Sequence, residues 1–223
     1  MQASVRLLAK RRFLPLFITQ FLGAFNDNLF KTALVLLVTY HIYSDPAKEA
    51  AFNAIAGGLF ILPFFIFSAL AGQLADGNDK AWLIRIIKTV EIAIMVFGAA
   101  GLLLPSVPLL LLALFAMGTH SAFFGPIKYA ILPQHLYKDE VLGGTGLVEA
   151  GTYAAILAGT IVGGIIQPPV AAGMVLFVAV AGWMSGRQVP PAPPVVEDHH
   201  FDPHIIRASI RLVSNAMRVK RLD

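Results

Sequence analysis

An aspartate and a lysine stand inside a long apolar stretch of this sequence. Asp27 is flanked by Asn26 and Asn28 and is followed four positions later by Lys31, within an apolar run from Leu14 to Tyr43. Charged side chains in a segment that can cross a bilayer are costly, and they commonly mark a substrate or ion pathway. The four-residue spacing places Asp27 and Lys31 on one helix face, where they can partly neutralise each other. These polar residues are therefore predicted to line a binding site.

A second group of candidate residues lies about 100 positions further along the chain. Gly125 and Pro126 interrupt another apolar run, and Lys128 follows within one helical turn. A glycine–proline pair in a membrane helix frees backbone carbonyls and bends the helix. A lysine at this depth can bridge much of the distance to Asp27. The alternative is that Lys128 extends to the inner membrane interface.

Two further clusters predict contacts between helices. Gly72 permits close approach of a neighbouring helix, and Asp76 at a helix boundary can face the positive N-terminus of another helix. Together with Lys80 they predict a latch between helices, the alternative being a plain polar turn. Gly159 and Gly163 have the small-xxx-small spacing of closely packed membrane helices.

The elements that must position these residues are predicted to be transmembrane helices. The chain is 57% hydrophobic and 13% charged, with a mean hydropathy of +0.73, whereas soluble domains carry about 25% charged residues. About 20 apolar residues span the hydrocarbon layer. The sequence therefore predicts an all-α membrane protein with six transmembrane helices, at Leu14 to Tyr43, Phe52 to Ala75, Leu83 to Leu104, Leu109 to Leu132, Leu142 to Ile166 and Pro169 to Met184.

The distribution of basic residues predicts the orientation of these helices. Lysine and arginine near helix ends favour the cytoplasm, so both termini are expected there. A signal peptide is the alternative for the first run, but that run is about twice the length of an h-region and contains Asp27. The net charge of +4 reflects this bias and gives no argument for nucleic acid. The basic residues assigned to the cytoplasmic side are Arg6, Lys10, Arg11, Arg12, Lys80, Arg85, Lys88, Lys138 and Arg187, while Lys48 falls on the other side.

The residues after the sixth span change in character. A Pro-rich cytoplasmic linker is expected at 188–203, after a membrane half-domain at 1–187, and a basic amphipathic helix at 204–223. That helix is expected either to lie on the membrane surface or to pack on the bundle. His199, His200 and His204 have no further ligand at a defined spacing, so no metal site is predicted.

Several phrases resemble a known family. The segment Gly72 to Lys80 resembles the loop of the major facilitator superfamily that has the pattern G-x-L-a-D-r-x-G-r-K/R. Gly77 stands where that pattern usually has arginine, and Asp79 stands where it has the second glycine. The phrases that resemble the bacterial lysophospholipid transporter branch of that superfamily are Gln20 to Asn28, Gly72 to Lys80, Gly125 to Pro133 and Val148 to Thr152. That branch includes the membrane domain of fused acyltransferase and acyl-carrier-protein synthetase proteins.

The resemblance implies a fold and a function. A major facilitator has twelve helices in two halves with the substrate between them, so this chain is expected to be the N-terminal half and to pair with a C-terminal half or a second subunit. It implies inward movement of a lysophospholipid such as lyso-phosphatidylethanolamine across the bacterial inner membrane. Asn26, Asp27, Asn28 and Lys31 would then contact the headgroup, and Lys128 its phosphate.

Two other functions remain open at this level. The chain can be the membrane domain of a multifunctional acyltransferase, with the chemistry in soluble domains beyond Asp223. It can also be a facilitator for another small solute, with Asp27 and Lys31 as a structural ion pair or a proton-coupling site. No Ser, His or carboxylate constellation predicts catalysis within this stretch, and neither a cofactor nor a metal is predicted.

Overall fold

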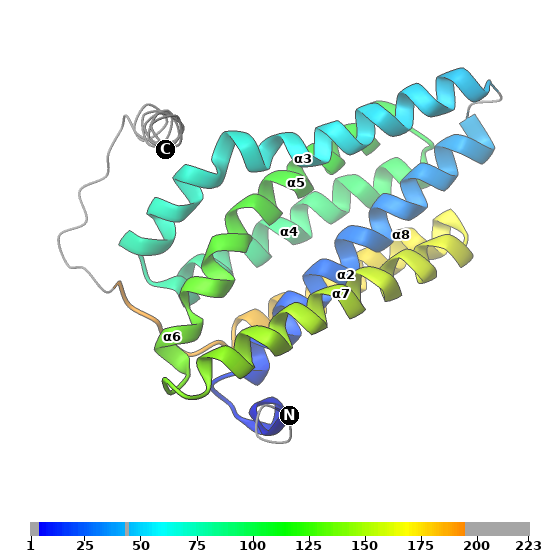
Figure 1. The fold of residues 1–223 in the computed structure, drawn as a ribbon. Helices are drawn as coiled ribbons and strands as arrows, with labels where there is room; N and C mark the ends of the chain where they lie inside the picture. The colour runs from blue at the N-terminus through cyan, green and yellow to red at the C-terminus, as the bar shows by residue number, and fades with distance from the viewer. Residues whose placement is uncertain (1–4, 43–44, 195–223) are drawn as a thin grey trace, which may run out of the picture.

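The computed structural model describes residues 5–42 and 45–194, and its regular structure in those ranges is helical (Figure 1). Six of its helices are long and apolar enough to cross a membrane, so the predicted number of spans is confirmed. The elements in chain order are the 3-10 turn η1 (Arg6–Ala9), α2 (Leu14–Leu37), its π-helical continuation η2 (Val38–Ile42), α3 (Pro46–Gly77), α4 (Lys80–Leu103), α5 (Val107–Ala130), the single turn α6 (Leu132–His135), α7 (Val141–Ile165) and α8 (Pro168–Gly186).

Helix α3 begins earlier than the apolar pattern predicts. The Asp45 side chain accepts a hydrogen bond from the amide of Ala47, and Pro46 occupies the first turn, an arrangement that starts a helix. The polar Lys48 and Glu49 are therefore helical although they lie before the predicted span. With 32 residues, α3 is about 48 Å long, more than the roughly 30 Å of hydrocarbon. It changes direction part-way along its length (Figure 1) and contains Pro63, a residue type that bends helices.

The long helices pack in pairs that join α2 and α5 to their neighbours. Helix α2 makes its largest contacts with α7 and α8, while α3 packs on α5, and α4 packs on α5 and α8. In Figure 1, α3 and α7 lie along the two edges of the bundle. The backbones of α2 and α7 approach closely at two glycines of α7 that leave no room for a side chain. A Cβ on Gly159 would meet the Phe25 carbonyl, and one on Gly163 would lie 2.6 Å from the Leu29 carbonyl oxygen.

A polar layer divides the apolar core into two parts. One cluster of buried side chains includes Leu34, Met95 and Leu114, and the other includes Phe13 and Ile84. Along α2, α4 and α5, several buried side chains between the two clusters are polar or charged. This layer contains Gln20, Asn26, Lys88, Glu91 and His120.

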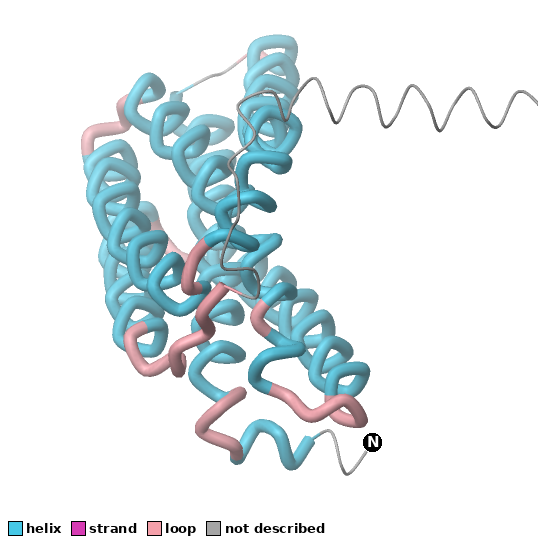
Figure 2. The backbone as a smooth tube through the Cα atoms, turned by 90° about the vertical axis from the view of Figure 1, so that its left-hand side faces the viewer, coloured by secondary structure: helices cyan, strands magenta, loops and turns pink. Residues whose placement is uncertain are grey.

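Residues 5–13 and the described residues after α8, 187–194, cover one end of the bundle, the end nearest the viewer in Figure 2. Arg12 lies 2.7 Å from the Glu140 carboxylate and donates to the His135 carbonyl at 3.1 Å. Residues 188–194, here named the strap, pack against the same end, with Val189 and Ala192 each 1% exposed.

Hydrogen bonds hold the strap to two helices, α4 and α6. The Ala192 carbonyl accepts from the amide of Lys80 at 2.9 Å, the Val189 carbonyl from Arg85 at 3.3 Å, and the Pro193 carbonyl from Gln134 at 3.1 Å. The described part of the predicted linker is therefore docked on the bundle, because its backbone carbonyls find donors there. The predicted amphipathic helix at 204–223, and His199, His200 and His204, lie outside the described residues.

Candidate binding cavity

A cavity of about 380 Å³ opens on the polar layer between α2, α3, α5 and α7. The structure brings four of the five predicted binding residues to its wall, namely Asp27, Asn28, Lys31 and Lys128. Asn26 does not line it. The other lining residues include Gln20, Gly23, Phe60, Phe64, Lys88, His120, Ser121, Phe124, Gly125 and Thr152.

Asp27 is held by a neighbouring helix and not by Lys31. One carboxylate oxygen of Asp27 accepts a hydrogen bond of 2.6 Å from the Ser121 hydroxyl on α5. The other carboxylate oxygen is buried and has no hydrogen-bond partner among the described residues. The Lys31 ammonium lies 5.4 Å from the centre of the Phe60 ring on α3, where the aromatic face attracts a cation. The expected Asp27–Lys31 ion pair is therefore wrong for this conformation.

The two asparagines beside Asp27 point in different directions. The Asn28 amide donates to the carbonyl of Ala24 in its own helix at 2.8 Å. The Asn26 amide donates to Glu91 at 3.3 Å and to the Val175 carbonyl at 3.2 Å, and its side chain is fully buried. Successive helix residues are turned by about 100°, so three consecutive side chains cannot share one face. Asn26 therefore faces the bundle interior, away from the cavity.

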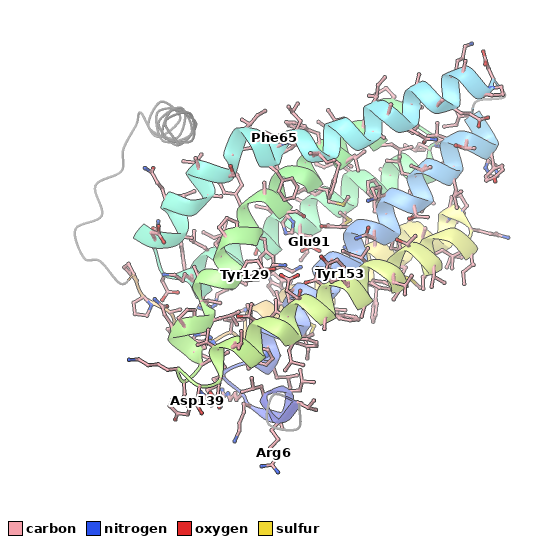
Figure 3. All side chains as sticks on the ribbon, viewed as in Figure 1. Arg6, Phe65, Glu91, Tyr129, Asp139 and Tyr153 are labelled. Carbon is pink, nitrogen blue, oxygen red and sulfur yellow. The ribbon has the colours of Figure 1, made fainter. Side chains whose placement is uncertain are left out.

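A buried charged cluster that the sequence did not predict lies behind this wall. Lys88 and Glu91 form an ion pair within α4, and each side chain is 1% exposed. The imidazole Nε2 of His120 lies 3.2 Å from the same Glu91 carboxylate oxygen. Figure 3 shows Glu91 deep between the helices. The available signal was the i, i+3 spacing of Lys88 and Glu91 within an apolar run.

The prediction that Lys88 is one of the basic residues at the cytoplasmic helix ends is wrong, because its side chain is buried. Its side chain runs inward through a slot bounded by glycines of α2 and α8. A Cβ on Gly23 would lie 3.3 Å from the Lys88 nitrogen, one on Gly182 3.0 Å from it, and one on Gly186 3.3 Å from the lysine Cγ. The glycines therefore leave the space through which Lys88 reaches Glu91.

Lys128 lies in the cavity wall near α7. Its ammonium is 3.4 Å from the Thr152 hydroxyl and 4.8 Å from the centre of the Tyr129 ring. Thr152 in turn donates to Gln20 on α2 at 2.8 Å. The hydroxyl of Tyr129 donates to Glu149 on α7. Lys128 is thus positioned by α5 and α7 together, and Gly125, one turn earlier, leaves open space in the wall.

The predicted latch residues do not form a common contact. Asp76 is exposed and has no described partner, and a Cβ on Gly72 would meet no atom within 4 Å. Lys80 is 2% exposed and contacts the strap through its backbone. Asp79, which departs from the family pattern, caps α4 by accepting from the amide of Trp82 at 3.0 Å. Its other oxygen accepts from the amide of Ala192 at 3.3 Å.

The charges of the cavity wall favour a ligand with an anionic group. Two lysines that have no ion-pair partner among the described residues, Lys31 and Lys128, line the wall together with one aspartate, Asp27, while Lys88 is paired with Glu91. An ammonium binds a phosphate as a point charge, and the free oxygen of Asp27 can accept hydrogen bonds from a cationic group. Among residues 5–42 and 45–194 no cluster of three His, Asp or Glu side chains suits a metal ion.

Comparison with known proteins identifies relatives of this chain. It is 31% identical over 153 residues to the lysophospholipid transporters LplT of Salmonella newport, Salmonella heidelberg and Salmonella dublin. The alignment covers 69% of this chain and 36% of each relative, so the chain matches only about a third of their length. No protein-family model matches the chain. No solved structure matches it.

Proposed function

We propose that this chain, which is a homologue of the lysophospholipid transporters of the major facilitator superfamily, forms one six-helix half of a lysophospholipid carrier. The named relatives are transporters, which favours transport over catalysis. The observation that supports the proposal most directly is the cavity in the polar layer, where charges of both signs lie within an apolar bundle.

The substrate's two parts match two kinds of surface. A lysophospholipid headgroup combines a phosphate with a polar or cationic group, and the cavity offers lysines beside the free oxygen of Asp27. The acyl chain requires an apolar path. The edge helices α3 and α7 expose large apolar side chains, among them Phe65 at 81% and Leu142 at 85%. In this proposal the headgroup enters the cavity while the chain stays among such side chains or in lipid.

In this proposal, a second six-helix half completes the cavity. Substrate sites of such carriers lie at the interface between two helical halves. The opposite wall, and the helix that Asp76 contacts as a latch, would come from a C-terminal half or a second subunit. The carrier would lie in the bacterial inner membrane with the strap on the cytoplasmic side, because the basic residues of the helix ends gather there.

Binding of a fluorescent lyso-phosphatidylethanolamine to the chain in lipid nanodiscs tests the proposal. Asp27→Asn and Lys128→Ala are each expected to weaken binding about ten- to a hundredfold, since hydrogen bonds to charged groups contribute about 1.5–3 kcal/mol. Lys138→Ala is the matched control, because Lys138 is exposed in the loop before α7. It is expected to bind as the unaltered chain does.

The same measurement can reject the proposal. Unchanged affinity in Asp27→Asn and Lys128→Ala would remove the headgroup roles of these two residues. If a sugar or another small solute displaced the labelled lipid while unlabelled lysophospholipid did not, the chain would serve a different solute. Uptake into proteoliposomes, with the chain alone and with a co-expressed second half, then shows whether movement needs the second half.

A further inference from the structure

Phe60 on α3 presents an aromatic face to a cation in the cavity wall. The Lys31 ammonium lies 5.4 Å from the centre of the Phe60 ring, and both side chains line the cavity. The face of an aromatic ring is negative and attracts a cation at this distance. Lys31 has no ion-pair partner among residues 5–42 and 45–194. The ring is therefore the group that the structure assigns to this ammonium.

The position of the Phe60 ring is fixed by its own helix and by α5. The backbones of α3 and α5 touch beside it, because a Cβ on Gly118 would meet the Phe60 carbonyl. Phe64 lies one turn later on α3, with its ring centre 6.0 Å from that of Phe60 and an interplanar angle of 59°. Tilted rings at this separation attract each other. The aromatic face is thus already in place when a ligand enters.

A phosphate in the cavity would change the partner of Lys31. An ammonium is attracted more strongly by a phosphate than by an uncharged ring, because the phosphate has a full negative charge. Lysine has a flexible four-carbon stem, so the Lys31 ammonium can turn from the ring to the phosphate. Its departure leaves the face of Phe60 to another cation.

We propose, as an extension that rests on the proposed function, that Phe60 is a specificity-determining residue whose ring face binds the ammonium of an amine-bearing lysophospholipid. Lys31 lies on this face before the lipid binds and turns to the phosphate afterwards. The headgroup ammonium then has two partners in one cavity wall, the Phe60 ring and the free carboxylate oxygen of Asp27. A lysophospholipid with an uncharged headgroup alcohol has no cation for the ring.

Binding of two lysophospholipids to the Phe60→Leu variant in nanodiscs tests this role. Leucine keeps an apolar side chain on α3 but has no aromatic face. Lyso-phosphatidylethanolamine should therefore bind about two- to thirtyfold more weakly than to the unaltered chain, the range of a cation–ring contact. Lyso-phosphatidylglycerol should bind no more weakly, because its headgroup has no cation.

Phe67→Leu is the matched control for this change. Phe67 belongs to the same helix and stacks on Phe123 of α5, with 5.7 Å between the ring centres. It is not among the residues that line the cavity. Both lipids should bind to this variant as they bind to the unaltered chain.

Fluorinated phenylalanines at position 60 separate the charge of the ring face from its size. Fluorine withdraws electrons from the ring and weakens its negative face, while the shape of the side chain changes little. One, two and three fluorine atoms should lower the affinity for lyso-phosphatidylethanolamine step by step. They should not lower the affinity for lyso-phosphatidylglycerol.

Each contrary result overturns a defined part. Equal weakening of both lipids in Phe60→Leu, or an affinity that does not follow the number of fluorine atoms, would show that the ring only packs against the ligand. The cation site would then be overturned while the proposed function stands. If neither lipid binds the unaltered chain, the proposed function fails and the cation site fails with it. If Phe60→Leu does not fold, as judged by gel filtration, the fluorinated series decides, because it keeps the ring.

Discussion

Lys88 and Glu91 are ion-paired and almost completely buried, with each side chain 1% exposed. Removing one charge leaves the other buried and unpaired, which costs about 3–5 kcal/mol. Glu91→Gln should therefore destabilise the chain by about that amount, as measured by thermal unfolding in detergent. The double variant Lys88→Met with Glu91→Gln should recover most of the loss, because no unpaired charge remains.

Asp139→Asn provides the control for this cycle, because Asp139 is an exposed carboxylate in the loop before α7 (Figure 3). Its unfolding temperature should match that of the unaltered chain. A double variant as unstable as Glu91→Gln alone would show that the lost stability comes from another contact of Glu91, such as its bond with Asn26.

The Arg12–Glu140 contact makes the covered end of the bundle sensitive to acid. The amide of Tyr137 and the Arg12 side chain lower the pKa of Glu140 below its ordinary value of 4.5. A lowered pKa in the folded state contributes stability above pH 4.5, and this stability is lost as the pH falls through the folded pKa. At pH 7 the amide hydrogens of residues 135–141 should therefore exchange faster in the Glu140→Gln variant than in the unaltered chain. The difference should vanish in strong acid; an equal difference at all pH values would contradict this origin.

Single residues also show how far sequence could predict the site. Asp27 and Lys128 were found because a charge inside an apolar run is conspicuous, and the structure places both in one cavity wall. The partner of Asp27 could not be found, since Ser121 is an ordinary residue 94 positions away. Lys88 was misassigned because it lies near the start of its span, where a lysine normally extends outward. Only the three-dimensional position of Gly23 and Gly182 shows that it turns inward.

Among the helices, the α2–α7 contact depends on two glycines. A side chain on Gly159 would meet the Phe25 carbonyl, and overpacking of this kind costs about 1–3 kcal/mol. Gly159→Ala should lower the unfolding temperature measurably. Gly164→Ala is the matched control on the same helix, because its Cβ would meet no atom within 4 Å. Equal losses in both variants would mean that backbone flexibility, and not close packing, is the reason for the glycine.

The connection between α3 and α4 depends on Asp79. Asp79→Ala removes the N-cap of α4, which costs about 0.5–2 kcal/mol, and also the bond to the strap at Ala192. We expect a lower unfolding temperature and faster proteolysis within 188–194. Asp76→Ala, three positions earlier, should change neither, because Asp76 has no partner among the described residues. Lower stability in Asp76→Ala with no change in Asp79→Ala would show that Asp76, and not Asp79, stabilises this connection.

Element boundaries were predictable where polarity changes and not where capping decides them. All six spans were located within a few residues except the start of α3, where Asp45 and Pro46 extend the helix through polar positions. The strap resembled a free linker because prolines favour extended backbone. Its docking depends on donors from Lys80, Arg85 and Gln134, which are remote in sequence.

For the whole molecule, the proposed orientation can be tested directly, because the sequence has no cysteine. Lys48→Cys lies in the first turn of α3, and Lys138→Cys lies before α7, at the opposite end of the bundle. In intact cells a membrane-impermeant maleimide should label Lys48→Cys, and it should label Lys138→Cys only after the membrane is opened. The opposite pattern would place the strap outside the cell.

The glycine slot around Lys88 has a consequence for how related sequences diverge. A lysine at position 88 requires the smallest residue at positions 23, 182 and 186 at once, although these positions belong to two other helices. Replacement of Lys88 by a shorter residue removes that requirement from all three. In an alignment of relatives, larger residues at these glycines should therefore occur together with loss of the lysine, and a carboxylate at position 91 should disappear with them.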